Sequence, residues 1–260
     1  MALRTVTAAR LELADARDFR HVGLCRDLEQ IMKAERAPFR VPAPGESLPW
    51  GRALFLNLTF WSAAEPSDVL TDDRVPTDVL CHSAWHHLAR QSLADGPLSA
   101  DALFLGEAIA SAFDLYLVGR LLANAPESDF LATQVPAMTD AALDAGASEA
   151  AVEALFAAVG DDPDGAFEDL RALLFDVCAS LVHAGGVDDA VARLAPFAGH
   201  RFHPLLHHYE VSNWILFARA HAPSALAPDP RVRAVDAALR AAPSSVEWLD
   251  AHWVQPRLSR

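Results

Sequence analysis

Residues 99–122 read SADALFLGEAIASAFDLYLVGRLL, a long apolar stretch with only four charged side chains. Ser99 is a residue type that caps helix N-termini, and Asp101 falls in the first turn, where the helix dipole favours a carboxylate. The stretch therefore predicts a helix from Ser99 through Leu122. A helix this apolar needs other elements to cover it, so the surrounding sequence should supply them.

The flanking sequence is helical as well. Apolar residues recur at helical spacing in several further segments, namely 11–36 (one helix or a pair), 77–90, 140–159, 166–184, 187–194, 207–221 and 230–242. Prolines between residues 38 and 49 predict a loop, and the aromatic, apolar run Ala53–Trp61 predicts the one strand. We expect a mainly α fold, with a small β element near residues 53–61, in one multi-helix domain over 1–260. Within it, a helix-and-strand subregion (1–75) should pack on a helical core (76–260).

Composition excludes several classes of protein. The 260 residues are 52% hydrophobic, which supports a folded core, and the formal net charge of −14 disfavours nucleic acid and anionic membranes. The glycines form no phosphate-binding or dinucleotide-binding motif, and Lys33 is the only lysine. Three cysteines without C-x-x-C spacing, and a first segment without a signal-peptide core, predict a soluble cytoplasmic protein.

Histidine is the conspicuous residue. Seven of the eleven histidines lie in two short stretches, residues 82–87 and 200–208. In the first, His82 and His86 are four residues apart, so on a helix both side chains project from one face and can share a metal ion.

A carboxylate follows at workable spacing. Glu107, Ser111 and Asp114 form one polar stripe on the apolar helix, and a buried carboxylate needs a compensating cation, proton or hydrogen bond. A metal held by His82, His86 and Glu107 would compensate it, with Asp114 orienting His86 or His87. The alternative is a structural Glu107 paired with Arg90 or Arg120.

These residues resemble the gluzincin type of zincin metallopeptidases. That family carries H-E-x-x-H on one helix and a glutamate ligand on a following helix, and the corresponding residues here are His82-Ser83-Ala84-Trp85-His86 and Glu107-Ala108-Ile109-Ala110. The resemblance implies a zinc-dependent hydrolase, with the strand over 53–61 in the place of the family's edge strand. Ser83 stands where the family has its catalytic glutamate, and a hydroxyl cannot take a proton from water as a carboxylate does.

Another group must then act as the base, and His87 and Asp114 are the nearest candidates. In the resulting mechanism the metal lowers the pKa of a bound water, one of these two residues accepts its proton, and His208 or Tyr209 stabilises the developing oxyanion. The substrate would be a small molecule or a peptide.

Two other functions fit the same residues. Five side chains could form a mono- or dinuclear non-haem Fe²⁺ centre of a helical oxygenase, with His203 and His207 joining His82, His86 and Glu107. The second alternative is a non-catalytic, partner-binding protein, with Trp248 and Trp253 as anchors. The sequence leaves the metal, the substrate and the oligomeric state open.

Overall fold

The computed structural model describes residues 2–59, 68–93, 99–221 and 226–259, and within them the expected mainly α fold with a small β element is confirmed. The strands are β1 (Leu3–Thr7), β2 (Glu12–Leu13), β3 (Pro38–Pro42) and β4 (Arg74–Val75). The helices are α1 (Gly23–Ala34), α2 (Trp50–Thr59), α3 (Thr77–Leu93), α4 (Ala100–Asn124), α5 (Asp129–Asp144), α6 (Glu149–Asp161), α7 (Pro163–Leu181), α8 (Val187–Leu194), α9 (Val211–His221), α10 (Pro230–Ala241), α11 (Ser245–Leu249) and α12 (Gln255–Leu258).

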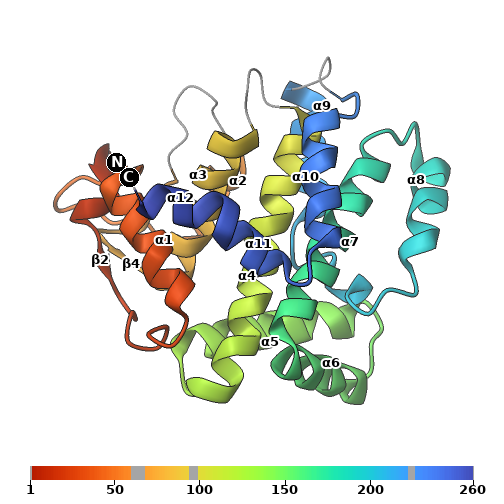
Figure 1. Cartoon of the computed structure of the whole chain (residues 1–260), viewed down its shortest axis with the longest axis horizontal. Helices are drawn as coiled ribbons and strands as arrows, with labels where there is room; N and C mark the ends of the chain where they lie inside the picture. The colour runs from red at the N-terminus through yellow and green to blue at the C-terminus, as the bar shows by residue number, and fades with distance from the viewer. Residues whose placement is uncertain (1, 60–67, 94–98, 222–225, 260) are drawn as a thin grey trace.

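Helix α4 runs through the middle of the molecule, packed on α7 and α3 along its length (Figure 1). Its length and composition would allow it to cross a membrane, but 89% of its most apolar window is buried, as in a core helix. The Ser99 hydroxyl caps it by accepting a hydrogen bond from the Ala102 amide at 3.1 Å. Asp101 in the first turn accepts from Arg233 of α10 at 2.7 Å, which ties the helix start to the C-terminal region.

Gly119 lets α4 approach the junction of α6 and α7. A Cβ at this position would lie 2.5 Å from the carbonyl oxygen of Val159 and 3.0 Å from the Pro163 side chain. Residues 161–165, an acidic segment at that junction, form an ordinary helix connection. In it the Asp162 side chain accepts a hydrogen bond from the Gly165 amide at 2.9 Å and caps α7.

The N-terminal part carries the β structure. Strand β1 pairs antiparallel with β3, β2 pairs parallel with β4, and a parallel bridge joins Arg40 to Val69. Helix α1 packs on α3 and contacts α12, the last helix of the chain. The N-terminal part and the C-terminal end therefore lie near each other (Figure 1).

Two local expectations are wrong. Residues 50–59 form helix α2 rather than a strand, and Phe60 and Trp61 lie outside the described residues. Phe55 is 61% exposed, so the segment does not bury its apolar side chains as a strand in a sheet would. The alanine and leucines of the segment are good helix formers. Residues 38–42, expected in a loop, form β3, whose prolines occupy the two end positions, where strands tolerate them.

Other differences concern helix boundaries. The single helix expected over 140–159 is divided between α5 and α6, because Gly146 has a positive φ of 91° and the Ser148 hydroxyl then caps α6. The helix expected over 207–221 begins at Val211, after a short 3₁₀ turn at His203–Leu205.

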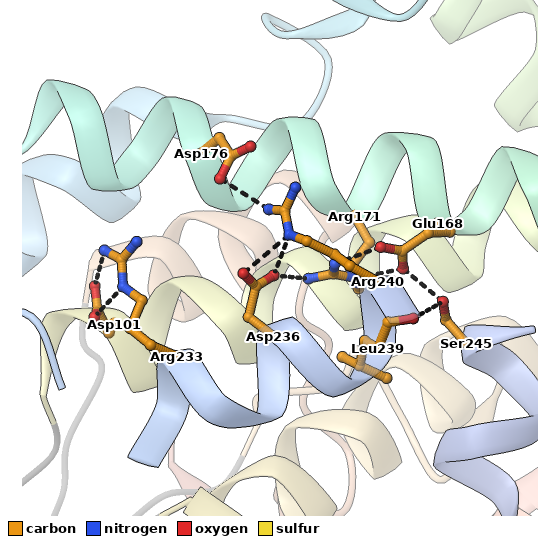
Figure 2. Close-up of polar contacts among 9 residues, drawn as sticks. All are labelled: Asp101, Glu168, Arg171, Asp176, Arg233, Asp236, Leu239, Arg240 and Ser245. Carbon is orange, nitrogen blue, oxygen red and sulfur yellow. Dashed lines mark hydrogen bonds and ion pairs between the residues drawn. The ribbon is translucent and has the colours of Figure 1, made fainter. Parts of the chain in front are cut away.

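A buried ion-pair network joins α7 to α10 (Figure 2). The Arg171 side chain is fully buried and donates to Asp236 at 2.8 Å and to Glu168 at 2.6 Å. Arg240 donates to the other side of Asp236 at 3.0 Å and to Asp176 at 2.8 Å. The carboxylates of Asp236 and Glu168 compensate the positive charge of the buried Arg171 guanidinium. Removing one of these groups would leave buried charge uncompensated.

Arg171→Ala is therefore expected to lower the free energy of unfolding by about 3–5 kcal/mol, since it leaves two carboxylates without their buried cation. Urea denaturation followed by circular dichroism measures this. Arg26→Ala is the matched control, because that side chain is 81% exposed and its ion pair with Asp27 is long, at 3.8 Å. Equal losses in both variants would contradict a stabilising role for the buried network.

Candidate metal site

Helices α3 and α4 hold the candidate site between them. The α3 start is fixed by Asp15, whose side chain accepts from the Thr77 amide at 2.8 Å, and the helix packs along α4. His82 and His86 lie one turn apart on α3, and Glu107 lies on α4. The expected convergence of these three side chains is confirmed: their potential ligand atoms lie within 4.8 Å of one another.

The distances are those of a shared ligand position. Nε2 of His82 and Nε2 of His86 are 3.1 Å apart, and Nε2 of His86 is 3.6 Å from Oε2 of Glu107. The side chains of His82 and His86 are 33% and 27% exposed, whereas that of Glu107 is 8% exposed. The carboxylate thus forms the floor of a site whose imidazoles reach solvent.

Asp114 lies beside the three residues, with its Oδ2 atom 2.9 Å from Nδ1 of His82. It orients His82 rather than His86 or His87, the two histidines expected from the sequence. The reason is the antiparallel packing of the helices: moving forward from His82 to His86 on α3 corresponds to moving back from Asp114 to Glu107 on α4. The alternative in which Glu107 pairs with Arg90 or Arg120 is wrong, since Glu107 faces His86.

The charges in this site perturb one another. Burial lowers the pKa of His82, but Asp114, with smaller contributions from Glu107 and Asp68, outweighs burial and raises that pKa to about 9. Burial, together with the neighbouring His82, lowers the pKa of His86 well below its ordinary value. Burial raises the pKa of Glu107 to about 8. Burial and the charge of Asp114 raise the pKa of Asp78, one turn before His82, to about 7. Clustered titrating groups with opposed shifts are typical of functional sites.

His87 is not brought to the site. Its Nε2 atom lies 2.7 Å from Oε2 of Glu35, next to Gln91 and near Arg257, which also donates to Glu35. One residue along a helix turns the side chain by about 100°, so His87 points toward α1 when His86 points toward α4. His87 is thereby engaged in fastening α1 and α12 to α3.

The second histidine stretch is split between two environments. His208 and Tyr209 lie close enough to Asp114 for its charge to oppose the burial that lowers the pKa of His208 and to raise the pKa of Tyr209, along with burial. The Tyr209 hydroxyl is buried without a hydrogen-bond partner among the described residues. His207 is exposed and His203 lies in the 3₁₀ turn, and neither belongs to the group that can share an ion.

Sequence reasoning missed Asp68. The buried Ser83 hydroxyl, directly after His82 on α3, donates a hydrogen bond to Oδ2 of Asp68. The charge of Asp68 also acts on His82 and Glu107. Asp68 belongs to no motif in the sequence, so only the fold could reveal its position.

Known proteins add nothing to this description. No family model, no curated protein and no solved structure matches the chain. The geometry of the site is therefore the basis for assigning a function.

In chelator-treated protein, Glu107→Gln is expected to raise the free energy of unfolding at pH 9 by about 1 kcal/mol or more, and to change it little at pH 5. The pKa of Glu107 is about 8 in the fold, against an ordinary value of 4.5. The unfolded chain therefore loses this proton first, and the fold is destabilised as pH rises from about 4.5 to 8. The uncharged amide avoids that cost.

Urea denaturation at the two pH values measures the effect. Glu153→Gln, at an exposed position of α6, is the matched control and should show no such pH dependence. A destabilised Glu107→Gln at pH 9 would mean that the carboxylate is a structural partner, not a metal ligand kept at a cost.

Proposed function

We propose that this chain is a metal-dependent hydrolase, a divergent zincin-like protein in which His82, His86 and Glu107 bind a divalent cation. The observation that carries the proposal is the convergence of two imidazoles and one buried carboxylate from adjacent helices. This donor set, two histidines and one glutamate, is a catalytic zinc set that keeps a coordination position for water or substrate.

The residues fit such an ion. Two nitrogens bound to tetrahedral zinc at about 2.0–2.1 Å lie about 3.3 Å apart, close to the 3.1 Å between the two Nε2 atoms. Without a cation at neutral pH, protons occupy His82 and Glu107, whose pKa values are about 9 and about 8. A divalent ion would replace both protons and satisfy the same carboxylates.

Other residues of the chain have supporting roles. Asp114 accepts from Nδ1 of His82, which fixes the ring and leaves Nε2 to bind the ion. The Tyr209 hydroxyl, which is buried with no hydrogen-bond partner among the described residues, and the adjacent His208 are the donors that would stabilise a substrate oxygen that gains charge. A bound zinc would supply Lewis acidity, and the exposed side of the imidazoles admits the substrate.

A mononuclear non-haem iron oxygenase is the second candidate, because two histidines and one carboxylate are also the ligand set of that class. The dinuclear version is not supported, since in the described part of the chain His203 and His207 stand apart from the three ligands.

Protein purified without added metal is expected to hold one equivalent of zinc, measured by inductively coupled plasma mass spectrometry. His82→Ala and His86→Ala should lose it, while His207→Ala, at an exposed histidine, should retain it. Iron taken up anaerobically at the same three residues would support the oxygenase. Absence of any metal, with folding unchanged in the variants, would contradict both enzymes and favour the partner-binding alternative.

Asp114→Asn is expected to weaken zinc binding by about 10–100-fold without unfolding the protein, because the amide can hold the His82 ring in the wrong tautomer. Competition with a chromogenic chelator measures the affinity. Asp176→Asn is the control, because it removes a 40% exposed carboxylate of α7 that pairs with Arg240 and not with His82, His86 or Glu107. Equal affinities in wild type and Asp114→Asn would show that the contact with His82 does not position a ligand.

A further inference from the structure

The site has a second carboxylate that no sequence motif assigns, Asp68, held by Ser83. Ser83 lies directly after His82, at the helix position where the gluzincin pattern has its glutamate base. At about 100° per residue, this position flanks the two histidine ligands on the side of His86, opposite the flank that Asp114 occupies. The Ser83 side chain is too short to act there itself, but its hydroxyl donates to Oδ2 of Asp68.

Asp68 is fixed by its backbone as well as by Ser83. Its carbonyl oxygen accepts from the Arg40 amide of β3 at 2.8 Å. The next residue, Val69, is bound at both its amide and its carbonyl by the Asn57 side chain of α2, at 2.7 and 3.0 Å. Two elements, β3 and α2, thus hold this backbone segment, and the Ser83 bond holds its carboxylate against α3, one residue after His82.

The electrostatic surroundings agree with this placement. The charge of Asp68 is among the causes that raise the pKa of both His82 and Glu107, so the carboxylate lies within electrostatic reach of these side chains. It also raises the pKa of Arg90, one turn beyond His86, against a larger lowering by burial. The Ser83 bond engages Oδ2, and no hydrogen bond joins Oδ1 to another described residue, so Oδ1 can accept a hydrogen bond from water.

We propose that Asp68, positioned by Ser83, is the general base of the site, in place of the glutamate that the zincin pattern would have at residue 83. This inference rests on the proposed function. In the step it describes, Oδ1 accepts a proton from water while the water oxygen forms a bond to the electrophilic atom of the substrate. The bond to the leaving group then breaks, and the leaving group takes the proton from Asp68.

The test uses the full chain loaded with Co²⁺ as the probe, because its visible absorption reports the ligand sphere. Asp68→Asn is expected to bind Co²⁺ within about threefold of wild type. The pH midpoint of its absorption change should move to lower pH, because a neighbouring negative charge opposes the loss of a proton. Hydrolysis of a p-nitrophenyl ester should fall by about 100-fold or more.

Three further variants make the result specific. Ser83→Ala should shift the midpoint in the same direction, and Ser83→Thr should restore it, because threonine keeps the hydroxyl. Asp188→Asn removes an exposed carboxylate of α8 and should change nothing.

Loss of Co²⁺ in Asp68→Asn would make Asp68 a ligand and overturn the inference, and so would an unchanged midpoint and rate with Co²⁺ bound. Wild-type protein that binds no Co²⁺ would instead overturn the metal site itself. The two failures are therefore distinguishable.

Discussion

The burial of α4 is the constraint on which the rest of the structure depends. A helix with apolar residues on all sides must be enclosed, so every acidic side chain on it has to find compensation inside the protein. Asp101 finds Arg233, and Asp114 finds His82. Among the described residues, Glu107 forms an ion pair with the His86 imidazole alone, at 3.6 Å, and burial raises its pKa to about 8. A carboxylate kept in such a position is explained by a cation more simply than by packing.

The antiparallel packing of α3 on α4 brings the acidic side chains of α4 together with the histidines of α3. It aligns two polar pairs, His82 with Asp114 and His86 with Glu107, in opposite chain directions. The Nε2 atoms of the two histidines then lie 3.1 Å apart, close enough to share one ligand position. The turn that carries His208 and Tyr209 closes in near Asp114, and Asp68 approaches along the other flank of α3.

Much of this could be predicted from the sequence because it is local. The spacing of His82 and His86, the capping of α4 by Ser99 and the polar stripe at Glu107 and Asp114 all follow from helix geometry. The prediction of a strand over residues 53–61 failed because short apolar runs do not distinguish a strand from a helix. Three contacts depend instead on how distant segments pack, which no local pattern encodes. They join Asp114 to His82, His87 to Glu35, and Asp68 to Ser83.

The structure gives Ser83 a role that the sequence alone does not indicate. In the sequence, a serine in the place of a glutamate argues against hydrolysis, because the hydroxyl is not a base at neutral pH. In the structure the same hydroxyl is a donor that holds a carboxylate from another segment beside the ligands. Arg40 holds the backbone of Asp68, Asn57 holds that of Val69, and Ser83 holds the Asp68 carboxylate. A carboxylate from another segment therefore accompanies the hydroxyl at the helix position where the sequence alone offers no acid.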